Sequence, residues 1–244
     1  MIILSTLLVC YNTPSFIAIG NLIMSSFEIE IKILNSNNIP SLFYKSPHAL
    51  IAGCDEVGRG CLAGPVVACC LCFKVDTPED LLSHIKDSKK LSSKKREIIS
   101  EQIKLYSHYK IAEVSVEIID EINILQASLL AMKNAYEELS KEISPKFLII
   151  DGNKSFKTDI PSFAIVKGDE KSLSIAGASI LAKVYRDQLM KDLSVDYQDY
   201  DWENNAGYGT KKHLVGLANN GITIHHRKSF NPVKNSFINN TKTH

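Results

Sequence analysis

The sequence has few of the features that mark membrane, secreted or strongly charged proteins. Its 28 Lys and Arg residues almost balance 27 Asp and Glu residues, which leaves a formal net charge of +1. No apolar run reaches the roughly 18 to 20 residues of a membrane-spanning helix. Residues 1–24 are apolar but lack the charged start of a signal peptide. With Met24 as an alternative initiator, residues 1–23 are expected to be an upstream extension that is not translated. The alternative, a cryptic signal peptide, fits poorly with the many thiols expected to be unpaired.

Cysteines spaced for a metal site are also lacking. Of the six cysteines, Cys69 and Cys72 form a CxxC string. They lie in an apolar run that predicts a buried strand, and residues three apart in a strand do not share a face. No second Cys or His pair stands at zinc-finger spacing. We therefore expect buried, reduced thiols and a cytoplasmic location rather than a disulfide scaffold.

Acidic residues are absent from one long segment. From Asn204 to the C-terminus there is no Asp or Glu, whereas residues 86–96 carry six cations against one acid, Asp87. A nearly neutral protein with such a distribution can present a basic face to a polyanion. The alternative is that these lysines only solvate an exposed helix or loop.

From about residue 50 the apolar pattern alternates between strand-like and helix-like periods, which predicts one α/β domain. Its C-terminal portion is expected to be mostly helical, and residues 1–47 form an N-terminal extension of uncertain structure. The predicted strands are 50–54, 66–73, 110–116, 147–150 and 162–166. The predicted helices are 94–106, with Ser92 or Ser93 as N-cap, a stripe from Ile122 to Leu139, and 172–193.

Carboxylates follow two of the predicted strands. Asp55 and Glu56 come directly after the first, and Asp151 comes after the strand 147–150. If these strands are neighbours, the acids meet at one sheet edge, and a helix laid across that edge would add Asp187. Clustered carboxylates repel unless cations neutralise them, and two Mg²⁺ or Mn²⁺ ions would suit phosphodiester hydrolysis. Alternatively, Asp151 caps a turn, and Asp187 is a solvated acid paired with Lys183 or Lys191.

The turn Gly58-Arg59-Gly60 follows the first acids. Glycines let main-chain N–H groups approach a ligand closely, and arginine offers a planar, permanent cation for phosphate. Asp-Glu before glycine is also common in ordinary surface turns, so the turn alone does not establish a site.

These motifs together resemble ribonuclease HII of the bacterial type. The matching segments occur in order over roughly residues 48–235: DEVGRGCLAGPV at 55–66, DSKKLS at 87–92, EIIDEINIL from 117, LIIDGN at 148–153, VKGD at 166–169, GASILAKVYRD at 177–187, GYGTKKHL at 207–214 and HHRKSFNPV at 225–233. Cys61 stands where many relatives have proline. The resemblance implies a ribonuclease H-like mixed sheet flanked by helices, with a helical C-terminal portion.

The resemblance also implies roles for single residues. Asp55, Glu56, Asp151 and Asp187 would be the catalytic, metal-binding acids. The turn Gly58, Arg59 and Gly60 would contact the ribonucleotide, partly through the 2′-hydroxyl that separates RNA from DNA, and Tyr208 would pack on the neighbouring sugar. Phosphate contacts are expected from Lys89, Lys90, Lys167, Lys183 and Lys212. For His213, His225 and His226 we favour packing or backbone contacts over catalysis.

The implied activity is that of an endonuclease that cuts the ribonucleotide-containing strand of RNA–DNA hybrids and of duplex DNA carrying single ribonucleotides. It would leave 3′-hydroxyl and 5′-phosphate ends and use two divalent ions, Mn²⁺ or Mg²⁺. We expect a monomer with a catalytic domain at 48–235, a disordered tail at 236–244, no membrane association and no obvious sliding-clamp-binding tail. The alternatives are a ribonuclease HIII-like nuclease and a non-catalytic nucleic-acid-binding module, although a pure binder gains nothing from acids near phosphates.

Overall fold

The structure, a computed structural model, describes residues 27–40, 49–86 and 92–236. Its centre is a five-stranded mixed sheet in the order β3-β2-β1-β4-β5. The strands are β1 (Ile51–Val57), β2 (Val66–Phe73), β3 (Ser107–Val114), β4 (Phe147–Asp151) and β5 (Ser162–Ile165). The pairs β1–β2 and β2–β3 are antiparallel, whereas β1–β4 and β4–β5 are parallel.

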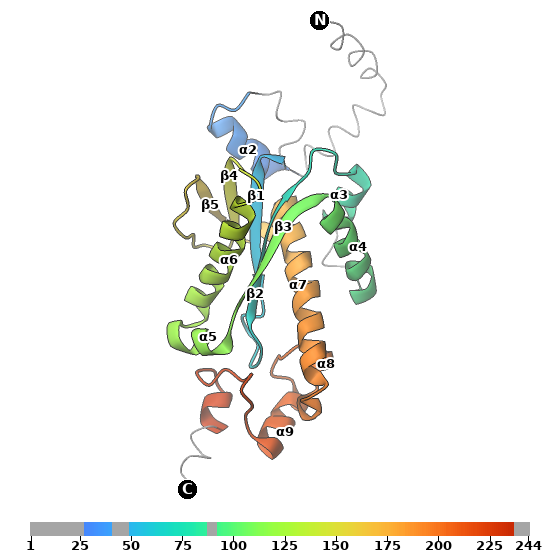
Figure 1. Ribbon diagram of the computed structural model, residues 1–244, viewed down its shortest axis with the longest axis vertical. Coiled ribbons are helices and arrows are strands. Elements are labelled where there is room, and N and C mark those ends of the chain that lie inside the picture. Colours follow the sequence, from blue (N-terminus) through green and yellow to red (C-terminus); the bar gives the residue numbers. More distant parts are fainter. Residues whose placement is uncertain (1–26, 41–48, 87–91, 237–244) are drawn as a thin grey trace, which may run out of the picture.

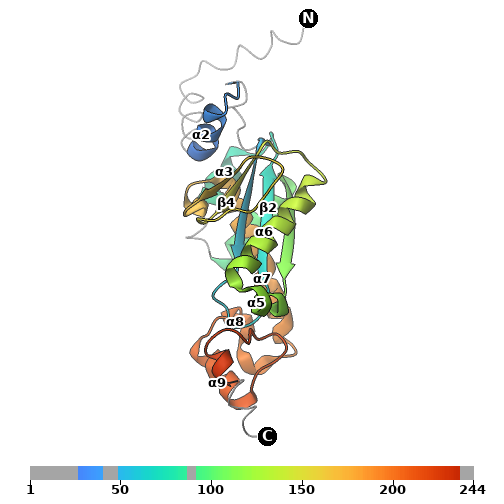
Figure 2. The same ribbon diagram turned by 90° about the vertical axis from the view of Figure 1, so that its left-hand side faces the viewer.

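Helices cover both faces of this sheet, as Figures 1 and 2 show. The helices are α2 (Glu28–Ser36), α3 (Glu79–Lys86), α4 (Ser93–Leu105), α5 (Val116–Ile122), α6 (Ile124–Ser140), α7 (Leu173–Ser194), α8 (Trp202–Asn205) and α9 (Lys211–Asn220), with short 3-10 turns η4 (Gly168–Glu170) and η5 (Gln198–Tyr200). The predicted mixed sheet flanked by helices, with a helical C-terminal portion, is present. None of the described helices is long and apolar enough to cross a membrane.

The strand β2 explains the two-layered core. All eight of its side chains are buried, because alternate residues face opposite sides of the sheet. Val67, Cys69 and Leu71 pack with α3, α4 and α7, whereas Ala68 and Cys70 pack with α6. Each of the five cysteines in the described segments is free and buried, as the sequence predicts.

The helix α2 was not predicted from the sequence. Leu34 is fully buried against Ile51 of β1 and Ile149 of β4. Glu30 is also fully buried, and the Ser172 hydroxyl at the start of α7 donates a 2.6 Å hydrogen bond to it. Part of the extension assigned to residues 1–47 therefore packs directly on the catalytic sheet. Residues 1–23 lie outside the described residues, as does the predicted tail except Ser236.

Several element boundaries differ from the predictions. The first strand runs to Val57 instead of ending before the acids, because Asp55 and Glu56 still pair with Cys69 and Ala68 of β2. The third strand begins at Ser107 and ends at Val114. The apolar stripe from Ile122 to Leu139 is divided at Asn123, whose φ of 68° breaks the helix and whose side chain then caps α6.

Candidate active site

Three of the predicted acids lie at neighbouring strands. Asp55 and Glu56 are in β1, and Asp151 is the last residue of β4. In the parallel ladder Cys54 is opposite Ile150, so Asp55 and Asp151 follow side by side. The adjacency that the sequence argument required is therefore present.

The face of the sheet on which Asp55 lies is set by Gly53. A side chain at Gly53 would come within 2.6 Å of the backbone at Ser174 and Ile175, so α7 crosses β1 at this glycine. Asp55 is two residues further and points the same way, where the Ser179 hydroxyl of α7 interacts with its carboxyl. The small residues at the start of α7 allow this close crossing.

Burial makes the ionised form of these acids unfavourable. Asp55 is only 6% exposed. Its burial, with repulsion from Glu56 and Asp151, raises the pKa of Asp55 well above its ordinary value, and the Ser179 hydroxyl opposes the shift only in part. The pKa of Glu56 is also raised, mainly by burial, although the Arg59 guanidinium acts against that rise. A cation beside the three carboxylates would relieve both effects.

One oxygen of Glu56 indicates where such a cation would bind. The Glu56 side chain is 6% exposed, and its Oε1 accepts a 3.1 Å hydrogen bond from Arg59. Its Oε2 is buried and has no hydrogen-bond partner. Buried carboxylate oxygens are normally paired or bound to a metal, so the donor set fits a hard divalent cation.

A further acid, Asp169, belongs to a turn that is bound to Asp151, and it was not predicted as a site residue. The N–H of Gly168 donates a 2.6 Å hydrogen bond to Asp151 Oδ1, which attaches η4 to the end of β4. Asp169 directly follows and is half-buried. The VKGD motif that contains Asp169 was recognised in the sequence. However, a pattern of acids that follow strands does not show that the later turn at Gly168 folds back onto the end of β4.

The structure does not join Asp187 to the other three acids by any described contact. Ser179, which touches Asp55, precedes it by eight residues, or about 12 Å along the helix axis at 1.5 Å per residue. Lys183 Nζ lies 2.7 Å from Asp187 Oδ1. The pairing that was one alternative for Asp187 is therefore present.

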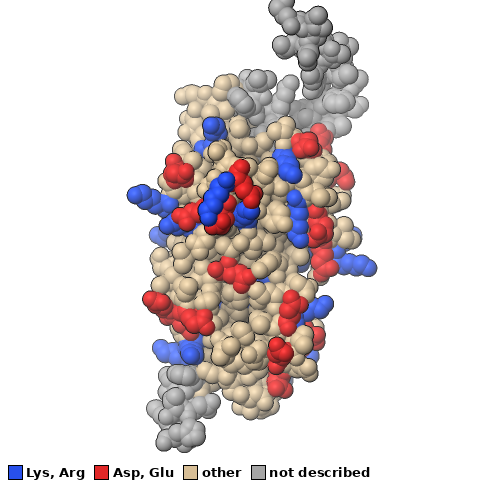
Figure 3. Space-filling model, in the orientation of Figure 1, with Lys and Arg blue, Asp and Glu red and all other residues tan. Residues whose placement is uncertain are grey.

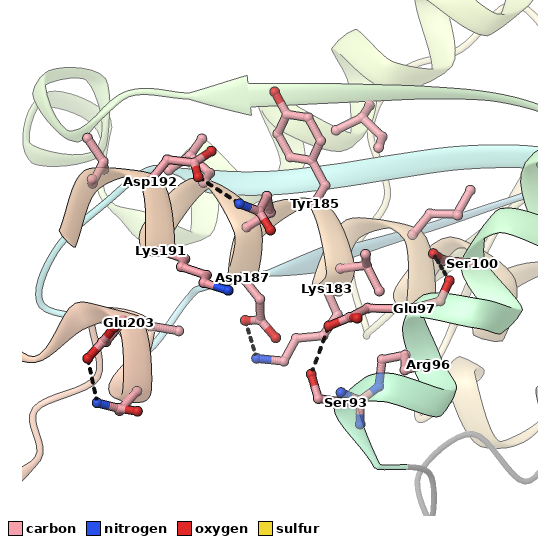
Figure 4. A pocket seen from close by; sticks show the side chains of 18 of the residues that line it. Ser93, Arg96, Glu97, Ser100, Lys183, Tyr185, Asp187, Lys191, Asp192 and Glu203 are labelled. Atoms are coloured by element: carbon pink, nitrogen blue, oxygen red, sulfur yellow. Dashed lines mark hydrogen bonds and ion pairs between the residues drawn. The ribbon is translucent and has the colours of Figure 1, made fainter. Parts of the chain in front are cut away.

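Asp187 and Lys183 line a groove of about 1400 Å³ between α7 and α4. Figure 4 shows both side chains pointing into this groove, opposite Arg96 and Glu97 of α4. Tyr208 lines it too, and the carboxylate of Asp187 contributes to the raised pKa of the Tyr208 hydroxyl, whose largest cause is burial. Asp187 therefore lies in the same groove as Tyr208 and close enough to affect its hydroxyl.

The glycine turn and Tyr208 lie side by side in the structure. A side-chain carbon at Gly60 would be 3.6 Å from the Tyr208 ring. The N–H of Leu62 also donates to the carbonyl of Gly207 at 2.8 Å. Arg59 and Tyr208 are 50% and 42% exposed, so both can reach a ligand.

The predicted phosphate-binding lysines have different environments. Lys183 is paired with Asp187, and Lys212 lies 3.4 Å from Asp201 with 76% of its side chain exposed. Lys167 adopts a left-handed conformation with a φ of 55° just before η4. Lys89 and Lys90 lie outside the described residues. On the described part of the face in Figure 3, basic and acidic side chains are interspersed, and no large single-sign area is visible.

His213 and His226 are fully buried and touch each other. Trp202 Nε1 donates to His213 Nε2 at 3.1 Å, and the N–H of Thr223 donates to His226 Nδ1 at 2.9 Å. Burial lowers the pKa of both histidines, that of His226 to about 3. His225 packs edge-on against Tyr197. These contacts agree with the expectation of packing and backbone roles.

In the described ranges, no three His, Cys, Asp or Glu side chains converge as a ready metal-binding group. Two candidate acids are instead paired with neighbouring cations, Glu56 with Arg59 and Asp187 with Lys183.

The sequence is similar to known ribonucleases of type HII. The family model described as Ribonuclease HII matches residues 52–239. A ribonuclease HII of Magnetococcus marinus is 46% identical over 208 residues, which are 85% of this chain and 92% of that protein. A ribonuclease HII of Bacteroides thetaiotaomicron is 48% identical over 190 residues, 77% of this chain and 92% of that one.

Solved structures show the same likeness. The Archaeoglobus fulgidus ribonuclease HII, determined in a complex with PCNA, has a TM-score of 0.61 and 29% identity, and the match covers 73% of this chain and 93% of that one. The Pyrococcus horikoshii ribonuclease H2 has a TM-score of 0.64 at 23% identity, over 79% and 99% of the two chains.

Proposed function

Because this chain belongs to the ribonuclease HII family, we propose that it cuts the ribonucleotide-containing strand of a duplex, at the ribonucleotide. The family assignment makes it an endonuclease of the ribonuclease H type, a hydrolase that acts on RNA–DNA substrates. The finer proposal includes single ribonucleotides embedded in duplex DNA. The observation that carries it is the adjacency of buried acids to the exposed glycine turn.

The acids Asp55, Glu56 and Asp151 are proposed to hold the divalent ions, Mg²⁺ or Mn²⁺. Asp169 is proposed as the fourth acid in preference to Asp187, since η4 is bound to Asp151 by the Gly168 N–H. When bound, such ions activate water and stabilise the leaving oxygen of a phosphodiester. A ribonuclease HIII of the same fold, 16% identical, has been solved with Mn²⁺.

The remaining site residues are proposed to select and orient the substrate. The main chain of Gly58 to Gly60 would approach the ribose, where only the 2′-hydroxyl separates RNA from DNA. Tyr208, beside this turn, would pack on the next sugar. Arg59 and Lys183 would turn from their carboxylates to phosphate oxygens, which position the duplex without reading its sequence.

The partners remain part of the proposal. We propose that the protein acts as a monomer, whereas the Archaeoglobus relative was solved with PCNA. Residues 237–244, where a clamp-binding tail would be sought, lie outside the described residues.

The variant Asp55→Asn tests the proposed metal site. It keeps the shape of the side chain and removes its charge, so cleavage should fall by about 100-fold or more, as for the loss of an electrostatic catalytic group. Affinity for the duplex should be retained. The test combines cleavage in Mg²⁺ with calorimetric titration of Mn²⁺. Wild-type cleavage by this variant would exclude Asp55 from the site.

A further inference from the structure

Two fully buried arginines, Arg186 and Arg227, lie under the glycine turn. In the described part of the chain neither forms an ion pair with a carboxylate. Burying a charge is costly unless it is paired or hydrogen-bonded. Other groups must therefore accept hydrogen bonds from both guanidiniums. The positions of these acceptors show which part of the chain the arginines fix in place.

The compensating groups are carbonyl oxygens of the segment that joins β1 to β2, which includes the glycine turn. Arg227 donates twice to the carbonyl of Gly64, at 3.0 and 2.9 Å, and once to that of Arg59 at 3.0 Å. Arg186 donates to the carbonyls of Pro65 and Ala63, both at 2.9 Å. The segment that leads from β1 to β2 is thus fixed by two planar, multidentate groups.

A third bond of Arg186 reaches the other half of the proposed substrate site. Its Nη1 donates to the carbonyl of Ala206 at 2.7 Å, two residues before Tyr208. Gly58 packs against the same guanidinium, since a side-chain carbon there would be 2.2 Å from Arg186 Nε. The glycine at 58, with a φ of 92°, therefore provides space for Arg186 as well as conformational freedom.

We propose that Arg186 and Arg227 are positioning residues for ribose selection. They hold the main chain of the Gly58–Gly60 turn at the distance at which it can meet a 2′-hydroxyl, and they contact no substrate themselves. A hydrogen bond to a hydroxyl depends on placement within a fraction of an ångström. Glycines alone would leave the turn free to move. This inference rests on the proposed function.

The test uses Arg227→Lys and Arg186→Lys, which keep the charge but lose the multidentate donors. Affinity is measured by fluorescence anisotropy for two duplexes of one sequence, one with a single ribonucleotide and one of DNA only. The preference for the ribonucleotide should fall by roughly tenfold, equivalent to about 1.4 kcal/mol. Affinity for the DNA duplex should change less than about twofold, because general phosphate contacts persist.

Two controls accompany these variants. Lys133→Arg also exchanges one basic side chain for the other, in α6 on the opposite face of the sheet from α7, and should keep the wild-type preference. The emission of Trp202, the one tryptophan of the chain, reports whether the C-terminal part is folded, since this side chain is fully buried there. If a lysine variant fails to fold by this measure, Gly58→Ala displaces Arg186 while both guanidiniums remain, and it should lose the same preference.

The outcomes separate this inference from the proposed function. A wild-type protein that neither prefers nor cuts the ribonucleotide duplex would overturn the proposed function. A wild-type protein with that preference, and folded variants that retain it, would overturn only the role of the arginines. An equal loss of affinity for both duplexes would also overturn it, because the arginines would then act through charge alone.

Discussion

At the scale of single residues, Asp187 and Asp169 are two candidates for the fourth acid of the proposed metal site. Asp187 lies in a motif that resembles the family, yet its side chain pairs with Lys183 in the groove. Asp169 follows Gly168, whose N–H binds Asp151. The periodicity of the sequence places Asp187 on a helix. It does not show at which point along that helix the ends of the acid-bearing strands lie.

The variants Asp169→Asn and Asp187→Asn distinguish these two acids. Asp169→Asn should lower kcat by about 100-fold, as for an electrostatic catalytic group, and should weaken Mn²⁺ binding. Asp187→Asn should leave Mn²⁺ affinity close to wild type, since this acid acts beside Lys183 and Tyr208. Steady-state cleavage and calorimetry make the comparison, and the reverse order of effects would restore Asp187 as the ligand.

A second residue-scale prediction concerns acid stability and His226. Its ordinary pKa is 6.5, and burial followed by repulsion from His213 lowers the pKa to about 3 in the folded chain. Below pH 6.5 the unfolded chain therefore binds the proton first. Stability should fall by roughly 1.4 kcal/mol for each pH unit as the pH decreases from 6.5 toward 3.

Urea unfolding at about pH 7 and about pH 5 measures this loss. His226→Asn should lose less stability between these conditions than the wild type, by about 2 kcal/mol. His84→Asn, at an exposed position of α3, is the matched control and should behave as the wild type. An unchanged pH dependence in His226→Asn would show that the buried histidine is not the cause.

At the scale of elements, strands were predicted more closely than their contacts. Val66 to Phe73 was predicted with its observed bounds, because a continuous apolar run is typical of a strand buried on both faces. The predicted first strand ends before Asp55, whereas β1 continues to Val57. The polar residues there do not show that pairing with β2 goes on past them. Asn123 has a local conformation that a stripe of apolar residues does not show.

The helix α2 shows a different limit of sequence-based inference. Four of its nine residues are apolar, but Ile29, Ile31 and Ile33 alternate with charged residues in the period of a strand, so the pattern does not predict a helix. Its stability comes from tertiary packing on β1 and β4. Short helices of this kind are specified by the surface that they cover.

Removing that packing should destabilise the whole domain. Leu34→Ala deletes a fully buried side chain, so the free energy of unfolding should fall by roughly 2 to 5 kcal/mol. Asn35→Ala, on the exposed side of the same helix, should change it by less than about 0.5 kcal/mol. Urea denaturation measures both, and equal stabilities would mean that α2 is not part of the cooperative unit.

At the scale of the whole molecule, one helix connects the two ends. Figure 1 shows α7 running along the sheet from the side of α2 to the C-terminal helices. Its start meets Glu30, its first half meets Asp55 through Ser179, and its second half carries Arg186 beneath the glycine turn. The proposed metal acid Asp55 and the glycine turn therefore both contact this one helix, which favours a fixed spacing between cleavage and recognition.

The central claim is cleavage directed by a ribonucleotide in duplex DNA. The most direct measurement incubates a duplex carrying one ribonucleotide with the protein in Mg²⁺ or Mn²⁺ and maps the product ends. We predict cutting at the ribonucleotide with 3′-hydroxyl and 5′-phosphate ends, and no cutting of the same duplex made of DNA only. No cleavage with either ion, or equal cleavage of both duplexes, would contradict the account.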